Sequence, residues 1–346
     1  MTALPFEPFG PMPDGRATSV YTLRNEHLRV RITDFGGRMV SIEAPDRTGR
    51  QDHVLLGFDT RAAYDAAGSF GTLLGRYANR IAGASITLDG QTFALSKNSG
   101  NATLHGGAEG FSKRIWDVAS AEADPLPTLV LTHRSPDGDQ GFPGELTVQA
   151  TYQLDASTLS LAFEAHTTKP TVVNLSAHPY FNLGGPARDD VLGHDVTIAA
   201  DAFLPTDADQ IPTGEIQPVA GTPFDFRHPT PLGARIRQPD PQIFHGLGYD
   251  HCFVLRADGP AVRVHDPASG RVLEIHTDHP GVQVYTGNKL AGAYAGHGGV
   301  IYRQSAGLAL EPQEFPDAPH RPTFPSTVLR PGDVYRRNIR YRFTTA

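Results

Sequence analysis

The sequence is poor in cysteine, since Cys252 is the only one among 346 residues. One thiol excludes an intrachain disulfide framework and any zinc or iron–sulfur site that needs several cysteines. No run of eighteen apolar residues occurs, and the first ten residues lack a basic start followed by an apolar stretch. We therefore expect a protein that is located in the cytoplasm and has no contact with a membrane.

Positive charge is also scarce. The 30 lysines and arginines are outnumbered by 37 aspartates and glutamates, which gives a net charge of -7. The charges are scattered along the chain, so no basic face is available to follow a phosphate backbone. We expect no nucleic-acid partner.

Several motifs for cofactor and nucleophile chemistry are missing from the sequence. It contains no Gly-x-Gly-x-x-Gly, no Gly-Lys-Ser/Thr and no Gly-x-Ser-x-Gly, which disfavours nucleotide cofactors and serine-hydrolase chemistry. His276 and His279 have the spacing of metal ligands, but Pro280 follows them and the segment is not helical, so the two rings need not face one site. We interpret both as histidines of a turn or strand end and expect no metal site.

Glycine and proline are abundant, with 36 and 29 residues, and apolar residues alternate with polar or small ones. The alternation over 146–154 continues over 159–165 after a turn at 155–157, which predicts a β-hairpin. Helical periodicity is confined to short pieces such as 59–67, too brief for the crossovers of a parallel sheet. No shift in composition marks a boundary, so residues 1–346 are expected to form a single all-β, antiparallel sandwich domain.

Four segments place polar residues in stretches rich in glycine and asparagine, where a β scaffold commonly presents functional groups. They are Gly75–Ile81, Asn101–Gly107, Asn174–Leu183 and Leu310–Asp317. Arginine, asparagine and carboxylate side chains fix hydroxyl groups by paired hydrogen bonds. The residues alone thus favour carbohydrate binding, although any single histidine or glutamate among them is more often structural.

At these segments the sequence resembles the aldose 1-epimerase (galactose mutarotase) family, and the resemblance extends through most of the chain in the same order. The further matching segments are Asp137–Gly144, Phe224–Phe226, Gly248–His251, Pro280–Asn288 and Phe315–Asp317. The resemblance implies a single large antiparallel β-sandwich, the galactose mutarotase-like supersandwich, with a few short helices and a sugar site in a cleft on one face.

The resemblance also assigns roles. Glu311 matches the general base that removes the proton of the anomeric C1 hydroxyl, and His178 matches the general acid that protonates the ring oxygen O5. The ring opens, the aldehyde rotates about C1–C2, and the ring recloses on the other face without a cofactor. His105 matches a second histidine near the ring oxygen and C1. The positions that match residues holding sugar hydroxyls are Asn79, Arg80, Asp250 and Gln283.

The expected partner is a monosaccharide, and the expected assembly is a monomer or a weak homodimer. A carboxylate suits the base, and histidine, whose ordinary pKa is about 6.5, suits the acid. The chain departs from the usual family pattern at Ala177 and Pro179, on either side of the proposed acid, and Pro312 fixes an extended approach for Glu311.

Aromatic residues in these motifs have two interpretations. Tyr180 and Phe181 are expected to belong to the core rather than to stack on a sugar, whereas Phe224 and Phe315 are equally compatible with packing and with lining the sugar.

Two other functions remain open beside interconversion of the α and β anomers of a free aldose. One is epimerisation of a hexose 6-phosphate, which needs extra cations although only four lysines occur. The other is a non-catalytic sugar-binding module, which would not need a base at the anomeric hydroxyl. The sequence does not distinguish galactose, glucose and pentoses as substrates.

Overall fold

The structure, a computed structural model, describes residues 2–185, 188–256 and 259–346. Strands dominate these residues, and every ladder between named strands is antiparallel there. This confirms the all-β, antiparallel fold. The two α-helices of the described part are short, α1 (Ala63–Ala67) and α2 (Pro241–Gly246).

Three larger sheets build the molecule, and neighbouring strands are hydrogen-bonded in each. In spatial order, the nine-stranded sheet contains β11 (Asp117–Glu122), β12 (Thr128–Ser135), β13 (Leu146–Asp155), β14 (Thr158–Thr167), β30 (Tyr335–Thr345), β24 (Arg271–Thr277), β23 (Val262–His265), β18 (Asp195–Ile198) and β21 (Thr230–Pro231). The six-stranded sheet contains β17 (Tyr180–Phe181), β28 (Leu308–Gln313), β25 (Gly281–Tyr285), β22 (Asp250–Leu255), β19 (Ala200–Leu204) and β20 (Gln217–Pro218). The five-stranded sheet contains β1 (Phe6–Pro11), β2 (Ala17–Arg24), β3 (Arg29–Thr33), β4 (Met39–Pro45) and β5 (Gln51–His53).

Five two-stranded pairs complete the described strands. They are β6 (Leu73–Leu74) with β16 (Ser176–Ala177), β7 (Arg80–Ile81) with β10 (Thr103–Leu104), β8 (Ser85–Leu88) with β9 (Gln91–Ala94), β15 (Thr171–Val172) with β29 (Val328–Leu329), and β26 (Tyr294–Ala295) with β27 (Ile301–Tyr302). Short 3-10 turns lie at η1 (Ala82–Ala84), η2 (Phe111–Lys113), η3 (Asp139–Gly141), η4 (Leu232–Ala234), η5 (His297–Gly299) and η6 (Ala318–His320).

The β13–β14 hairpin shows why the alternating pattern folds as it does. In β13 the apolar positions from Leu146 to Leu154 are buried, and the residues between them are exposed or half-buried. Asp155 pairs with Thr158, so Ala156 and Ser157 alone form the turn, with Ala156 at φ 45°. A two-residue turn with positive φ matches the twist of antiparallel strands, and the expected hairpin is confirmed.

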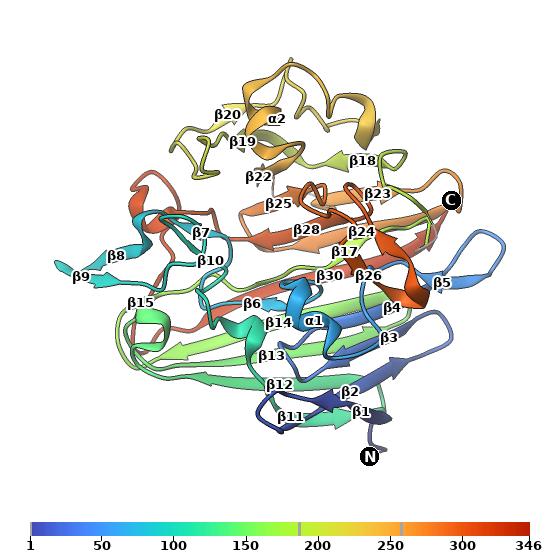
Figure 1. Cartoon of the computed structure of the whole chain (residues 1–346), viewed down its shortest axis with the longest axis horizontal. Helices are drawn as coiled ribbons and strands as arrows, with labels where there is room; N and C mark the ends of the chain where they lie inside the picture. Colours follow the sequence, from blue (N-terminus) through green and yellow to red (C-terminus); the bar gives the residue numbers. More distant parts are fainter. Residues whose placement is uncertain (1, 186–187, 257–258) are drawn as a thin grey trace.

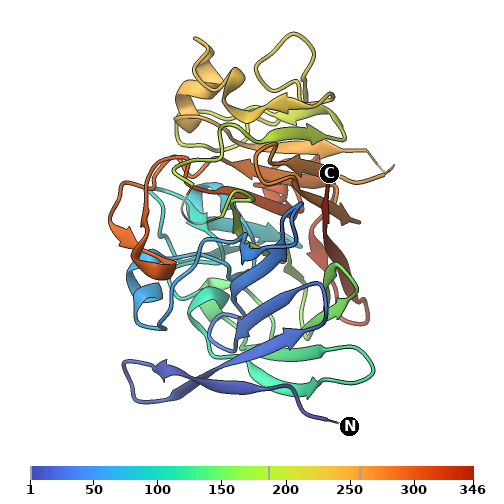
Figure 2. The same ribbon diagram turned by 90° about the vertical axis from the view of Figure 1, so that its right-hand side faces the viewer.

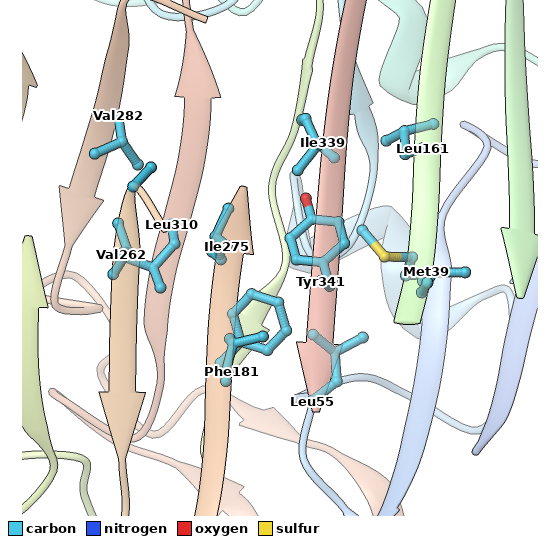
Figure 3. Packing of buried hydrophobic residues seen from close by; sticks show 14 of the residues in the cluster. Met39, Leu55, Leu161, Phe181, Val262, Ile275, Val282, Leu310, Ile339 and Tyr341 are labelled. Carbon is cyan, nitrogen blue, oxygen red and sulfur yellow. The ribbon is translucent and has the colours of Figure 1, made fainter. Parts of the chain in front are cut away.

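The core lies between the sheets, as in a sandwich. Figure 3 shows Ile275 and Tyr341 of the nine-stranded sheet beside Val282 and Leu310 of the six-stranded sheet, with Met39 of the five-stranded sheet close by. All belong to one cluster of buried apolar side chains that extends from Leu4 to Phe343. Burying one such side chain contributes about 1.5–3 kcal/mol, so this cluster holds the three sheets together.

The two ends of the molecule are formed by different parts of the chain. The strands β19 and β20 with α2 lie at one end, and β1 and β2 lie at the other, next to β11 (Figures 1 and 2). The strands β25 and β28 of the six-stranded sheet and the short strands β6, β7 and β10 lie between these ends (Figure 1). Among the described residues, no helix is long and apolar enough to cross a membrane.

Candidate active site

Neighbouring strands of the six-stranded sheet carry three of the expected site residues. Asp250 begins β22, Gln283 lies in β25 and Glu311 lies in β28. Gln283 is directly paired with Glu311 in the ladder. Side chains of paired residues lie on the same face of a sheet, which brings groups distant in sequence together.

Pro312 does not interrupt β28. The neighbouring strand β17 pairs only with Leu308 and Ala309, so Pro312 lies beyond the end of that strand. Its carbonyl accepts a hydrogen bond of 2.7 Å from Ser176 Oγ. The extended approach expected for the Glu311 carboxylate is therefore present.

Arg80 lies in β7, Asn79 directly precedes that strand, and His105 directly follows β10. Leu104 pairs with Arg80, the His105 amide donates to the Asn79 carbonyl at 3.0 Å, and the Asn79 amide donates to His105 Nδ1 at 3.1 Å. Asn79 and His105 both have left-handed φ values, 62° and 52°. Non-glycine residues adopt this conformation only where their surroundings hold it, commonly at functional sites.

His178 lies between β16 and β17, and its backbone is held on both sides. Its amide donates to the Thr72 carbonyl at 2.9 Å, and its carbonyl accepts from the Gly71 amide at 2.8 Å. Ala177, one of the two departures from the family pattern, belongs to β16 and pairs with Leu73. The short sheet thus fixes the ring position although the flanking residues are unusual.

These elements surround a cavity of about 240 Å³. Six of the seven expected site residues line it, and Gln283 does not. Gln283 lies behind the cavity wall, where its Nε2 donates to Asp250 Oδ1 at 2.7 Å. The residues that line the cavity are Ala67, Ser69, Phe70, Asn79, Arg80, Leu104, His105, His178, Tyr180, Asp250, Tyr285, Lys289, Leu290, Tyr294 and Glu311.

His178 and Glu311 form a buried acid–base pair in this cavity. His178 Nε2 lies 3.5 Å from Glu311 Oε1, and both side chains are almost completely buried. Burial lowers the pKa of His178 to about 4. Burial, followed by the charge of Asp250, raises the pKa of Glu311 well above its usual value, while Arg80 acts in the opposite direction. Such shifts make both groups candidates for proton transfer.

The tautomer of His105 is set by its backbone contact. Because Nδ1 accepts from the Asn79 amide, the proton of the neutral ring is on Nε2. Burial lowers the pKa of His105 well below its usual value, and His178 and Arg80 lower it further. His105 is therefore a neutral hydrogen-bond donor, and its ring meets that of His178 edge to face at 5.5 Å.

His105, His178 and Glu311 are also the residues that bring three metal-type ligand atoms within 4.8 Å of one another among the described residues. A histidine that binds a metal usually donates its other ring N–H to an acceptor. His105 does the opposite, since its Nδ1 accepts from an amide. The arrangement fits proton transfer better than metal binding. His276 belongs to β24 and His279 follows that strand, as expected for histidines at a strand end.

A polar network that the sequence did not reveal joins the expected sugar-binding residues. Arg80 Nη2 donates to Gln210 Oε1 at 2.6 Å, and Gln210 Nε2 donates to Asp250 Oδ2 at 2.7 Å. Lys289 Nζ also donates to Gln210 Oε1, at 3.3 Å. Gln210 lies in a loop without any motif, whereas Lys289 directly follows the matched segment 280–288 and could have been found there.

The aromatic residues of the matched motifs are buried, and one of them also borders the cavity. Tyr180 belongs to a buried apolar cluster, as expected, and its ring also borders the cavity, 4.7 Å from His178 and 4.5 Å from Phe70. Phe181 is a core residue, as expected. Phe224 and Phe315 are buried in apolar clusters away from the cavity lining, so packing is their role. Position along β17 explains the difference, since successive strand residues face opposite sides.

The antiparallel scaffold, together with a buried acid–base pair between hydroxyl-binding groups, is typical of enzymes that move protons on a sugar. A family model described as aldose 1-epimerase matches residues 19–342. This chain therefore belongs to the aldose 1-epimerase family.

Curated relatives cover nearly the whole chain. Galactose mutarotase from Sus scrofa is 41% identical over 343 residues, with 98% of both chains covered. Aldose 1-epimerase from Escherichia coli (strain K12) is 39% identical over 340 residues, with 96% of both covered. Among solved structures, an aldose epimerase homologue from C. elegans matches with a TM-score of 0.88 and 30% identity, covering 95% of this chain and 100% of its own.

Proposed function

We propose that this chain catalyses the interconversion of the α and β anomers of a free aldose by acid/base-catalysed ring opening and reclosure. The observation that carries the proposal is the 3.5 Å approach of His178 Nε2 to Glu311 Oε1 inside a cavity lined by hydrogen-bonding groups. Membership of the aldose 1-epimerase family supports the same reaction.

Glu311 removes the proton of the C1 hydroxyl, and His178 donates a proton to the ring oxygen. An anomeric hydroxyl is too weak an acid to ionise at neutral pH, so proton removal and donation must occur together. Glu311 Oε2 has no hydrogen-bond partner among the described residues, which leaves it available to a hydroxyl. Neutral His105 donates its Nε2–H near the reacting atoms.

The pair carries one proton through the whole cycle. Burial raises the pKa of Glu311 and lowers that of His178, so the resting proton lies on the carboxyl group. Ring opening starts from the other arrangement, with the proton on His178, and it ends with the proton on Glu311. Ring closure reverses this transfer, so both anomers are formed with the same pair.

The polar wall binds the sugar hydroxyls. Arg80 donates and Asp250 accepts, and both line the cavity together with Asn79. Such groups hold the pyranose so that its C1 hydroxyl and ring oxygen lie next to the acid–base pair. This positioning lowers the activation barrier of ring opening. Arg80 also stabilises negative charge that develops on a nearby oxygen.

The test is the optical rotation of freshly dissolved α-D-galactose and α-D-glucose with and without the protein. We expect the approach to equilibrium to accelerate in proportion to protein concentration. Binding without acceleration would identify a sugar-binding module. Acceleration only with the 6-phosphorylated sugar would identify a phosphosugar epimerase, for which Arg80 and Lys289 are the cationic side chains lining the cavity.

A further inference from the structure

We infer that Gln210 is a positioning residue that sets substrate affinity and discrimination between sugar epimers, by fixing the Arg80 guanidinium and the Asp250 carboxylate relative to each other. The inference rests on the proposed function. The inference goes beyond that function because Gln210 belongs to no matched motif and does not itself line the cavity.

The orientation of the Gln210 amide is determined by its partners. The Arg80 guanidinium can only donate, so Oε1 must face Arg80 and Nε2 is left to face Asp250. The contacts are 2.6 and 2.7 Å long, and Gln210 is about nine-tenths buried. A short, buried bridge between a cation and an anion restricts both side chains to one arrangement.

The other oxygen of Asp250 is held as well. Gln283 Nε2 donates to Oδ1 at 2.7 Å, so both carboxylate oxygens of Asp250 accept from a glutamine amide. Arg80 has Gln210 as its side-chain partner at Nη2. Gln210 is thus the connection between the donor and the acceptor that face the sugar.

The loop that carries Gln210 is built to hold it. Gln210 has a left-handed φ of 62°, its amide donates to the Asp207 carbonyl at 3.0 Å, and Asp207 Oδ1 accepts from the Ile211 amide at 3.0 Å. The preceding Thr206 amide donates to Gln242 Oε1 in α2 at 2.7 Å. These hydrogen bonds hold the loop so that the Gln210 side chain points toward the cavity wall.

A fixed donor and acceptor recognise hydroxyls at one spacing and orientation, and epimers differ in the orientation of a single hydroxyl. If the bridge is lost, Arg80 and Asp250 remain in the cavity but can adapt to either epimer. Affinity and discrimination should then fall together, while the chemistry at His178 and Glu311 continues. Loss of binding shared by ground and transition states raises KM and leaves kcat unchanged.

The experiment measures kcat and KM for galactose and glucose with the wild type, Gln210→Leu and Gln210→Glu. Gln210→Leu should raise KM about tenfold with kcat within about twofold, and it should bring the two sugars' kcat/KM values closer together. Gln149→Glu on the exposed side of β13 is the matched control and should change neither constant.

The Gln210→Glu variant gives the readout that a merely structural role would not produce. Its introduced carboxylate accepts from Arg80 and Lys289 but repels Asp250, so KM should be high at neutral pH. At low pH the introduced carboxyl is protonated and can donate to Asp250, so KM should return toward the wild-type value. The wild type and Gln149→Glu should not show this pH dependence of KM.

The possible failures are distinguishable. An active wild type with unchanged KM and unchanged sugar preference in both Gln210 variants would overturn this inference alone. A lower kcat together with lower thermal stability in the Gln210 variants, with no pH-dependent recovery of KM, would also overturn this inference. That result would show a structural role. A wild type that neither binds nor interconverts any aldose would remove both this inference and the proposed function.

Discussion

Burial is the main cause of the shifted pKa values of the His178 ring and the Glu311 carboxylate. In water a carboxyl group loses its proton well before imidazolium does. In the cavity, burial lowers the pKa of His178 and raises that of Glu311, which reverses this order. The resting proton of the pair therefore lies on Glu311, and it must be on His178 before ring opening begins.

Replacing either member of the pair should stop catalysis while sparing binding. We expect Glu311→Gln and His178→Asn each to lower kcat by about 10²–10⁴-fold, the contribution of a positioned acid or base. Glu311→Gln keeps the side-chain volume and His178→Asn adds no bulk, so sugar affinity measured by calorimetry should remain. Glu164→Gln, on the exposed side of β14, is the matched control. A near-normal rate in either variant would remove that residue from the mechanism.

The pH profile should respond to Asp250. After burial, the charge of Asp250 is the next cause that raises the pKa of Glu311. Asp250→Asn removes this charge, so the carboxyl of Glu311 loses its proton more readily. The alkaline limb of the kcat/KM profile, which reports the last proton of the pair, should move to lower pH.

The control for this shift is Asp117→Asn, at an exposed position of β11. Its profile should overlap that of the wild type. An alkaline limb that stays in place, or that moves to higher pH in Asp250→Asn, would contradict the assignment of that limb to the carboxyl of Glu311.

The turn that follows β28 is hydrogen-bonded to β7. The Asp317 amide donates to the Arg80 carbonyl at 2.8 Å, and Asp317 Oδ1 accepts from the Ala82 amide at 2.9 Å. The same buried carboxylate accepts from His320 Nδ1 at 2.7 Å and from Arg321 Nε at 3.0 Å. The strand that carries the base is thereby fixed to the strand that carries Arg80.

Asp317→Asn should destabilise the protein and weaken substrate binding. In the variant, the side-chain NH2 of the introduced asparagine faces at least one N–H group that donates to the carboxylate in the wild type. That N–H group loses its acceptor, which lowers the free energy of unfolding by about 1–3 kcal/mol. The shift of β7 should raise KM as Arg80 moves. Denaturant unfolding and steady-state kinetics measure the two effects, and an unchanged KM with lowered stability would show that β7 keeps its position without the carboxylate.

The loss of stability in Asp317→Asn should depend on pH. The hydrogen bond to Asp317 raises the pKa of His320 above 6.5. A raised pKa means that the pair stabilises the fold below pH 6.5, and that this stabilisation disappears as pH rises through the raised value. The difference in unfolding free energy between wild type and variant should therefore be larger at acidic than at alkaline pH. A difference that grows with pH would contradict this coupling.

Across the whole molecule, one apolar core joins the three large sheets. Its buried residues come from β3, β14, β28 and β30 alike. Figure 3 shows Leu161 of β14, Leu310 of β28 and Tyr341 of β30 in one region of this core. We propose that residues 1–346 form a single domain, because no sheet buries its apolar face without the others.

This proposal predicts one cooperative unfolding transition. Leu161 in β14 is fully buried, and Leu161→Ala should cost about 2–5 kcal/mol. Activity reports on the cavity and far-UV circular dichroism reports on all sheets, so both should be lost at the same lowered temperature. Loss of the circular dichroism signal while activity persists would show that the cavity folds independently of the nine-stranded sheet.

Local patterns in the chain were enough to predict the strands and the catalytic candidates. Alternation over Leu146–Leu154 and the turn after Asp155 depend on interactions within a few residues, so they were readable without the fold. The motifs around His178 and Glu311 identified the family and the expected acid–base pair. The family model that matches residues 19–342 confirms the family assignment.

The construction of the cavity wall, in contrast, depends on the packed fold. Gln210 lies 130 residues from Arg80 and 40 from Asp250, and it meets them because the order of strands brings their loops together. Gln283 supports the wall instead of lining the cavity for the same reason. Likewise the pKa directions of His178 and Glu311 follow from burial. Strand order and burial are properties of the packed sheets as a whole, and no local pattern in the chain encodes them.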